Sequence, residues 1–361
     1  MKKLISGLAV IIFMFSMSSG KAYAAEALGF EISGFVDSSY IWNDNAVGGT
    51  AAEYNTFGLD QVEINITKEI KDWASLRFDL QHCPSAGSCA ANTRDDDIIE
   101  QGYLTLTAPV GDGVTFTFGK FNAPIGFELL DPVDMYQFSH SLVFNNGIPT
   151  NLTGGMLSTS FGEMFDVSFY VVNGWDVNPE GAGSSGTNKT VGGRLGITPI
   201  KDVNVGFSGI IGKGDGAGGV LTVFDIDGTI KLIPDLTLGF EFNFGSDNNA
   251  IAAGNDADWF GFLLMGHYDF LEWFGMTLRY DYFDDDDGGL RLAPGTPNGR
   301  ATGLPDTRQA ITVSPTFVIG EGFGALFEYR HAFSNQNVFT NSNGTPTDNN
   351  DSIAFEMTYA F

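Results

Sequence analysis

The sequence predicts an all-β protein: a transmembrane antiparallel up-and-down β-barrel of about 16 strands, with short periplasmic turns and long extracellular loops. The first observation is the alternation at the end of the chain, where Ile353, Phe355, Met357, Tyr359 and Phe361 share one face and polar or small residues share the other. The second is that this pattern recurs along the chain. Because a backbone in lipid must satisfy every N–H and C=O internally, such strands are expected to pair in a closed ring.

The last residue carries a separate signal. An aromatic that closes the alternation at the terminus, Phe361 with Tyr359 two residues before it, resembles the assembly signal of bacterial outer-membrane barrels. The resemblance implies two partners, the barrel assembly machinery and outer-membrane lipid.

The first residues predict export. Met1-Lys2-Lys3 precedes an uncharged apolar run from Leu4 to Met17, and Ala22-Tyr23-Ala24 is a small-residue cleavage site. We therefore expect a signal peptide at residues 1–24 and a barrel domain at 25–361, in the outer membrane of a Gram-negative bacterium. No later segment has the roughly 18 uninterrupted apolar residues of a membrane helix.

Composition narrows the class of protein. Without Lys2, Lys3 and Lys21, the mature chain keeps 15 of the 18 basic residues against 44 acidic ones, a formal net charge of −29. This balance offers no basic stripe to phosphates, so nucleic acid is excluded as a partner. The 47 Gly and 32 Phe suit many strands with tight turns and a lipid-facing surface. A soluble secreted β-sandwich or an acidic surface-layer protein is the alternative on composition alone.

Alternation and turn residues place the strands in order. The first has Phe30, Ile32 and Val36 opposite Glu31, Ser33 and Asp37, and the clearest has Leu236 to Phe244 alternating with Thr237 to Gly245. Short turns are expected at Glu69 to Trp73, Pro109 to Gly113, Pro199 and Pro234-Asp235. Strands are expected at 28–43, 57–68, 75–81, 98–107, 114–121, 153–161, 165–175, 191–198, 203–212, 220–232, 236–245, 258–270, 276–283, 307–319, 324–333 and 352–361.

Tryptophan gives an independent check. Trp42, Trp73, Trp175, Trp259 and Trp273 all fall at predicted strand ends. Amphipathic rings at strand ends are typical of the aromatic girdles at the two membrane interfaces.

The face opposite the lipid is predicted to be polar or small. It carries many ionisable groups, which require water: Asp37, Glu63, Arg77, Asp79, Asp166, Arg194, Asp225, Asp227, Lys231, Glu241, Arg279, Asp281, Glu328, Arg330 and Glu356. A barrel of about 16 strands is wide enough for an aqueous channel. Passive diffusion of small hydrophilic solutes and ions follows as the expected function. For any single residue, a salt bridge that only stabilises the wall is the alternative.

A long segment at residues 122–151 interrupts the strand pattern, and segments of this length are usually functional or disordered. Around its start, Gly119-Lys-Phe-Asn-Ala-Pro-Ile-Gly-Phe-Glu128 follows a strand rich in Thr and Phe. This stretch, with Phe57-x-Leu59-x-Gln61, Gln101-Gly-Tyr-Leu104 and Phe361, resembles the β-barrel porin family called OmpL-like. The resemblance implies an outer-membrane channel in which the long loop folds inward as a constriction.

An inward loop would place Glu128, Asp131 and Asp134 across from wall cations such as Arg77, Arg194, Arg279 and Arg330. Carboxylate clusters favour cations in a pore, so we expect a weakly cation-preferring channel. The alternative is an external lid, in which Pro124, Pro132 and the apolar residues pack at the outer rim. Phosphate-selective porins are similar in architecture, but they need a lumen dense in Arg and Lys, which this chain lacks.

Two cysteines, Cys83 and Cys89, lie close together in a Gly/Ser/Ala/Pro segment. In an exported protein this spacing favours a disulfide that pins a loop, over free thiols or metal ligation. The C-x-x-C-H haem signature is absent, and no cofactor is predicted.

Three other sets of residues resemble functional motifs without matching them. Asp284 to Asp287 followed by two glycines lacks the alternating ligand spacing of an EF-hand, so a solvated loop tip or loose divalent bridging to anionic lipid is expected instead. Gly212 to Gly219 has no G-K-[ST] ending. The histidines, His82, His140, His267 and His331, are dispersed, and no G-x-S-x-G elbow supports an enzyme.

Two functions of another class stay open: a barrel that sheathes a partner such as a multihaem cytochrome in an electron conduit, and a surface adhesin that presents acidic loops. The size of the barrel suits a homotrimer.

Overall fold

The chain forms a closed ring of strands. The computed structural model describes residues 29–47, 54–83, 98–176, 189–213, 219–251, 255–285, 291–292 and 306–361. The barrel strands are β1 (Glu31–Asn43), β3 (Tyr54–Lys71), β4 (Ala74–His82), β5 (Ile99–Ala108), β6 (Val114–Asn122), β7 (Asn151–Phe161), β8 (Phe165–Val172), β9 (Thr190–Ile200), β10 (Val203–Lys213), β11 (Val220–Ile233), β12 (Leu236–Ile251), β13 (Asn255–Leu271), β14 (Phe274–Asp285), β15 (Asp306–Gly320), β16 (Phe323–Ser334) and β19 (Asn349–Ala360).

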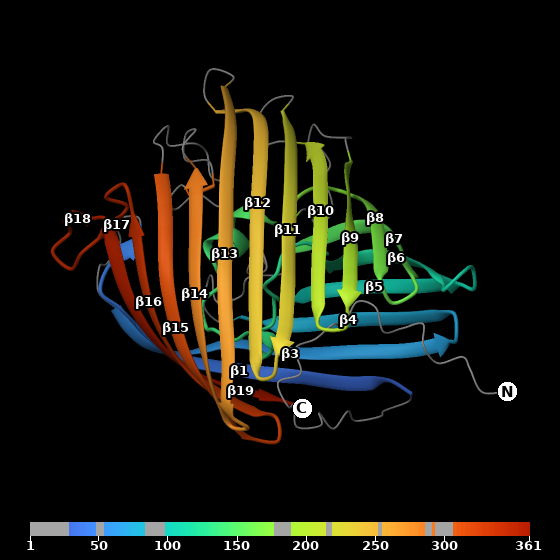
Figure 1. The fold of residues 1–361 in the computed structure, drawn as a ribbon, viewed down its shortest axis with the longest axis horizontal. Helices are drawn as coiled ribbons and strands as arrows, with labels where there is room; N and C mark the ends of the chain where they lie inside the picture. The colour runs from blue at the N-terminus through green and yellow to red at the C-terminus, as the bar shows by residue number, and fades with distance from the viewer. Residues whose placement is uncertain are drawn as a thin grey trace.

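All 16 of these strands run antiparallel to both neighbours, and β19 pairs with β1 to close the barrel (Figure 1). At the seam Phe35 lies opposite Ala360. Just beyond it, Gly34 N–H donates to Phe361 O at 3.1 Å and Phe361 N–H donates to Gly34 O at 3.0 Å. Within the described residues, closure pairs every barrel strand on both sides, as lipid requires. The predicted antiparallel barrel and its strand number are confirmed.

The two rims differ. At one rim, short turns join β3 to β4, β7 to β8, β9 to β10, β11 to β12, β13 to β14 and β15 to β16. At the other rim, β2 (Ala46–Val47), β17 (Phe339–Thr340) and β18 (Pro346–Thr347) form a small sheet of their own, which the sequence pattern did not predict. That the short turns face the periplasm stays a prediction.

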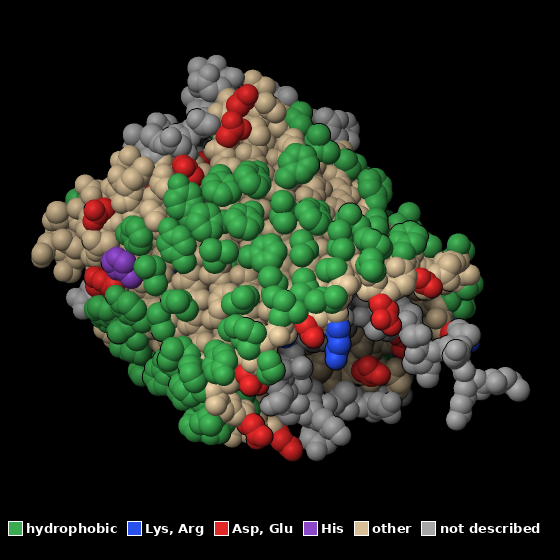
Figure 2. Space-filling view, viewed as in Figure 1, with side chains coloured by type: hydrophobic (Ala, Val, Ile, Leu, Met, Phe, Trp, Pro, Cys, Tyr) green, Lys and Arg blue, Asp and Glu red, His purple; other side chains and the backbone are tan. Residues whose placement is uncertain are grey.

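Hydrophobic side chains cover the outside of the barrel. Figure 2 shows them as a broad band across β11 to β14, and Phe224, Leu264 and Leu278 are 62%, 47% and 56% exposed. Trp73 and Trp273 lie exposed in the short turns, as expected of an interface girdle. Trp259 is an exception: it points into the barrel and is buried, and its indole N–H donates to Asn243 Oδ1 at 2.9 Å.

The helical parts of the chain belong to the long segment between β6 and β7. They are the 3₁₀ helix η1 (Pro132–Asp134) and the α-helix α1 (Leu142–Gly147). Among the described residues, neither helix has the length and apolar composition needed to cross a membrane. Both lie within the ring of strands, and α1 lies against β12 to β15. The predicted signal peptide at residues 1–24, Cys89 and Asp286-Asp287 lie outside the described residues, so the predictions made for them are not tested.

Candidate functional site

The long segment lies against the inner wall of the barrel, and a glycine makes its entry possible. Gly126 has φ +89°, and a Cβ there would lie only 2.5 Å from Ile148 Cδ1. The next residue, Phe127, donates its N–H to Glu241 Oε2 on β12 at 2.9 Å. Further along, Ser139 N–H donates to Glu328 Oε2 on β16 at 3.1 Å. These contacts with inward-facing residues place the segment in the lumen, where a constriction loop would lie, rather than over the outer rim.

A buried ion pair joins the loop to the wall. Arg279 Nη1 lies 2.6 Å from Glu128 Oε1, and the side chains of both residues are almost fully buried. Arg279 Nε also contacts Asp281 Oδ1 at 3.0 Å, and Arg330 Nη2 contacts Asp281 Oδ2 at 2.9 Å. Leu142 N–H at the start of α1 donates to the same Asp281 carboxylate at 3.1 Å. Of the predicted residues, the structure thus brings Glu128, Arg279 and Arg330 together around Asp281.

Asp131 lies on a different side of the lumen, in an unexpected environment. Its carboxylate gathers with those of Glu63 on β3 and Glu100 on β5, with one oxygen from each residue within 4.8 Å of the others. Burial raises the pKa of Asp131 well above its usual range, Glu63 and Asp134 raise it further, and Arg77 opposes the rise. The expectation that Asp131 faces a wall cation therefore holds only in part, because carboxylates surround it more closely.

The remaining residues predicted to lie at the constriction are Asp134, Arg77 and Arg194. Burial raises the pKa of Asp134, and Arg77 counteracts this rise. Arg77 Nε itself contacts both carboxylate oxygens of Asp79 at 3.0 Å. Arg194 forms an ion pair with Asp227 on β11, with Nη2 2.6 Å from Oδ1. The structure thus pairs Arg77 and Arg194 with carboxylates of the wall.

The lumen contains an apolar core that the alternation in the sequence does not predict. Val143 and Phe144 of α1 are buried with Ile125, Ile148 and the wall residues Phe121, Leu152, Met156, Tyr170, Val172, Ile210, Leu221, Val223, Trp259 and Phe283. The expectation of a polar or small inner face is therefore wrong near these residues. A signal existed: in Val220-Leu221-Thr222-Val223 apolar residues occupy both faces of one strand, which in a porin-like barrel indicates packing on the inside as well.

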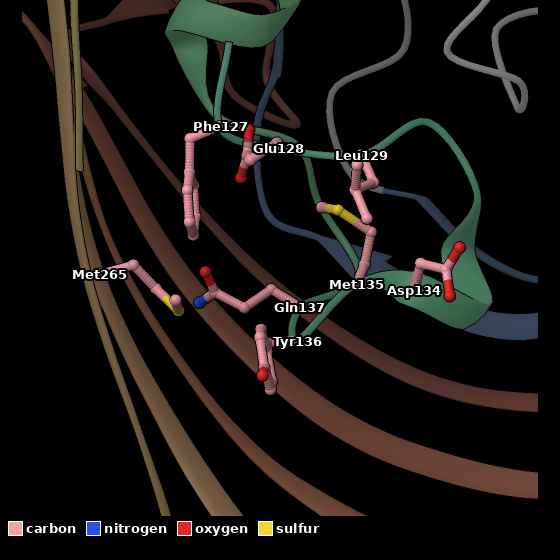
Figure 3. Close-up of a pocket in the computed structure, with 8 residues that line it drawn as sticks. All are labelled: Phe127, Glu128, Leu129, Asp134, Met135, Tyr136, Gln137 and Met265. Carbon is pink, nitrogen blue, oxygen red and sulfur yellow. The ribbon is translucent and has the colours of Figure 1, made fainter. Parts of the chain in front are cut away.

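The loop also encloses a small pocket. Figure 3 shows Phe127, Tyr136 and Gln137 extending from the loop toward the wall, where Met265 of β13 faces them; Glu128, Leu129, Asp134 and Met135 complete the lining. Thr277 Oγ1 donates to Tyr136 O at 3.2 Å, and the Tyr136 ring lies 4.2 Å from the His267 ring. The pocket is thus bounded by segments of the loop that the wall already holds.

His140 illustrates how the lumen affects a loop residue. Burial lowers its pKa below the usual 6.5, although the nearby Glu128 carboxylate opposes this. Its Nε2 lies 2.8 Å from Leu129 O and its ring stacks on Phe144 with centroids 3.9 Å apart. A neutral His140 that donates Nε2–H to Leu129 O therefore supports the start of α1.

A closed 16-stranded antiparallel barrel with apolar side chains outside and charged residues inside defines the class of porin-like outer-membrane barrels. Solved structures agree. An anion-selective porin from Comamonas acidovorans has a TM-score of 0.66 at 10% identity, over 92% of this chain and 99% of that one. The outer-membrane channel DcaP of Acinetobacter baumannii has a TM-score of 0.62 at 11% identity, over 94% and 99%. OmpT of Vibrio cholerae in its trimer form also gives 0.62, at 12% identity over 92% and 99%.

The family follows from a match to its sequence profile. Residues 29–361 match "Putative beta-barrel porin-2, OmpL-like", so the chain belongs to this porin family. The sequence matches none of the proteins of curated function with which it was compared. The family resemblance expected from Gly119 to Glu128 is confirmed. Because the solved structures are so distant in sequence, their likeness shows the fold alone.

Proposed function

We propose that this protein is a channel for passive diffusion of small hydrophilic solutes and ions across the outer membrane of a Gram-negative bacterium. The observation that carries the proposal is the buried pair of Glu128 and Arg279, which holds a long loop inside a barrel of 16 strands. A barrel of this width needs side chains or loops to narrow it, and charged groups at the narrowing set which solutes pass.

A weak preference for cations is part of the proposal. The inward-facing arginines are engaged by carboxylates: Arg77 by Asp79, Arg194 by Asp227, and Arg279 and Arg330 by Asp281. Four further acidic residues, Asp37, Asp225, Glu241 and Glu356, are buried on the inner side of the wall. The anion-selective porin from Comamonas acidovorans shares the fold. Ion preference therefore depends on the lumen charges of each chain, and here carboxylates outnumber cations.

Catalysis is not part of the proposed function. The structure does bring together His267, Thr277 and Asp269, with His267 Nδ1 2.8 Å from Thr277 Oγ1 and Nε2 3.0 Å from Asp269 Oδ1. A hydrolase would need an accessible nucleophile in this arrangement. Thr277 is fully buried and donates its hydroxyl to Tyr136 O. The three residues therefore support the loop instead.

The channel is tested by adding the purified protein to planar lipid bilayers. Discrete conductance steps from the protein alone are expected, and a tenfold KCl gradient should give a reversal potential of the sign for K⁺ preference. A barrel that only sheathes a cytochrome, or an adhesin, would give no steps without a partner. Conductance steps with anion preference would reject the proposed cation preference but support the proposed channel.

We also propose a homotrimer. One solved structure of Vibrio cholerae OmpT is of its trimer form, and this chain presents a broad apolar outer surface on which copies could pack within the membrane. Native mass spectrometry of protein extracted in mild detergent is expected to give three times the mass of the chain, whereas a monomer mass would reject the proposal.

A further inference from the structure

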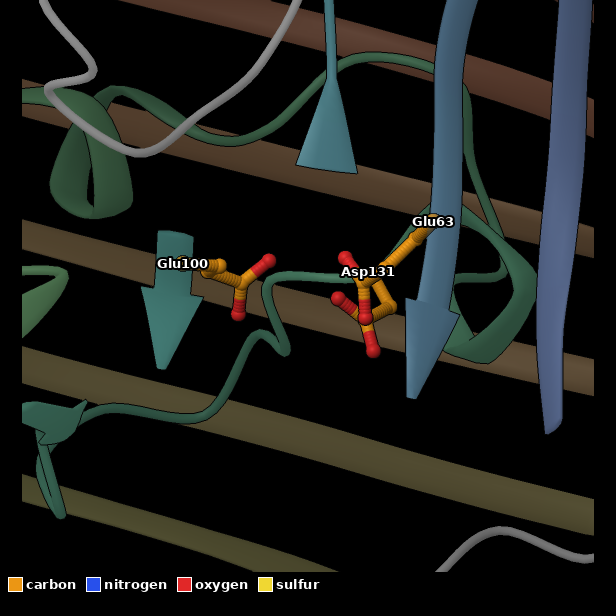
Figure 4. Close-up of side chains that lie close together, drawn as sticks. All are labelled: Glu63, Glu100 and Asp131. Carbon is orange, nitrogen blue, oxygen red and sulfur yellow. The ribbon is translucent and has the colours of Figure 1, made fainter. Parts of the chain in front are cut away.

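Three carboxylates from separate parts of the chain converge inside the barrel. Glu63 comes from β3, Glu100 from the start of β5 and Asp131 from the loop just before η1, and Figure 4 shows their carboxylates directed toward one another. One oxygen of each lies within 4.8 Å of the others. Glu63 and Glu100 are fully buried. Three such charges repel strongly in this environment unless a cation compensates them.

Hydrogen bonding leaves part of this cluster unsatisfied. Gln61 Nε2 donates to Glu63 Oε2 at 3.1 Å and Asn122 Nδ2 donates to Glu100 Oε1 at 3.1 Å. Glu100 Oε2 and Asp131 Oδ1 are buried, and no amide, hydroxyl or guanidinium donor among the described residues reaches either atom. The Glu100 carboxyl instead lies within hydrogen-bond reach of another carboxyl, that of Glu63. Buried polar atoms are nearly always satisfied, so an orphaned oxygen on a fully buried Glu100 indicates a missing partner.

Local arginine does not supply that partner. Arg77 faces the cluster, and it affects the pKa of Asp131, but its Nε is held 3.0 Å from both oxygens of Asp79. Asp79 and Asp134 add further negative charge nearby. Around Glu63, Glu100 and Asp131, acidic side chains therefore outnumber basic ones.

The geometry suits a hard divalent cation. Ca²⁺ takes six to eight oxygen ligands at about 2.3–2.6 Å, so two ligands on opposite sides of one ion lie at most roughly 5 Å apart. The 4.8 Å limit on the three carboxylate oxygens fits within that span. An all-oxygen set without His or Cys favours Ca²⁺ over transition metals, and Mg²⁺ would demand stricter octahedral geometry.

We propose that Glu63, Glu100 and Asp131 form a Ca²⁺ site that clamps the long loop to β3 and β5. The loop is already tied to β14 by Glu128 and Arg279, and to β16 by Ser139 N–H and Glu328. The cation would provide a further anchorage, on the wall formed by β3 and β5. It would replace mutual repulsion of three carboxylates with a bridge between loop and wall.

Calcium binding can be measured independently of channel activity. The full-length protein in detergent, stripped with EDTA, is titrated calorimetrically with CaCl₂ and separately with MgCl₂. We expect one Ca²⁺ site per chain, weaker Mg²⁺ binding, and a higher thermal unfolding midpoint when CaCl₂ is present. No heat of binding at millimolar CaCl₂ would overturn the proposal and indicate carboxyls that share protons instead.

Matched variants locate the site. Asp131→Asn and Glu100→Gln keep the side-chain size and remove one charge each. Each is expected to weaken Ca²⁺ binding by about tenfold or more, because loss of a residue that only hydrogen-bonds to a metal ligand already weakens metal binding by about tenfold. Glu272→Gln removes an exposed charge from the turn between β13 and β14 and should keep Ca²⁺ binding within about threefold of the unaltered chain. A heat-dependent shift in gel mobility confirms that each variant is folded. Equal Ca²⁺ binding by all variants would place the ion elsewhere and reject the assignment.

Discussion

At the scale of single residues, the contact between Glu128 and Arg279 determines where the loop lies. Arg279 is 1% exposed, so its charge depends on Glu128, Asp281 and Ser139 O rather than on water. Removing one partner of a buried pair leaves a buried charge uncompensated, which costs far more than the pair itself gains. The pair therefore fixes the position of the loop more than it stabilises the fold.

Glu128→Gln is expected to lower the free energy of unfolding by on the order of 3 kcal/mol, because Arg279 would keep only its contacts to Asp281 and Ser139. Denaturant-induced unfolding from lipid vesicles measures the change. Glu69→Gln, at an exposed position of β3, is the control and should change the free energy by less than about 0.5 kcal/mol. In the double variant with Arg279→Met the two losses should not add, and strict additivity would contradict direct coupling.

The sequence identified the residues of this contact but not their partners. Glu128 and Arg279 both follow from the inward face and the long loop, yet nothing in the local pattern specifies which arginine meets which carboxylate. Asp131 shows the limit clearly: by charge alone it should face a cation, whereas it gathers with Glu63 and Glu100. Pairings between distant strands depend on how the loop crosses the lumen, and this information is not local.

At the scale of elements, the strands were predictable because each one is amphipathic by itself. In β12 the alternation of Leu238, Phe240 and Phe242 with Gly239, Glu241 and Asn243 directly encodes a lipid face and a lumen face. The helix α1 was not predictable in this way. Its six residues, Leu142–Gly147, are too few for a periodic signal. Ser141 caps the helix by accepting a hydrogen bond from Phe144 N–H at 3.1 Å, and packing against β12 to β15 stabilises it further.

Phe144→Ala should loosen α1, since removal of a buried aromatic ring costs about 3–5 kcal/mol where the site cannot collapse. The expected results are higher and noisier single-channel conductance and faster amide hydrogen exchange in residues 142–147. Phe118→Ala is the matched control: Phe118 lies on β6 and is 61% exposed toward the lipid, so conductance should not change. Equal effects of the two changes would mean that α1 does not limit the channel.

At the scale of the whole molecule, the distribution of charge follows from the barrel. Lipid excludes ionised groups from the outer band, so the carboxylates of an acidic chain collect on the inner face, on the loop and at the rims. Figure 2 shows the outer band of the visible face almost free of charge, with acidic side chains at its margins and in the hollow beside the lower strand ends. Composition therefore predicted that acidic residues would outnumber basic ones on the inner face, whereas the apolar core around α1 could be found only from the structure.

If this field sets selectivity, the preference for cations should depend on ionic strength. The Debye length falls from about 10 Å at 0.1 M salt to about 3 Å at 1 M, so carboxylates along the wall lose influence over an ion in mid-channel. The permeability ratio of K⁺ to Cl⁻, taken from reversal potentials in gradients centred on each concentration, is expected to fall toward unity at 1 M. A ratio that stayed constant would instead assign selectivity to direct contacts between the ion and groups of the loop or the wall, where screening has least effect.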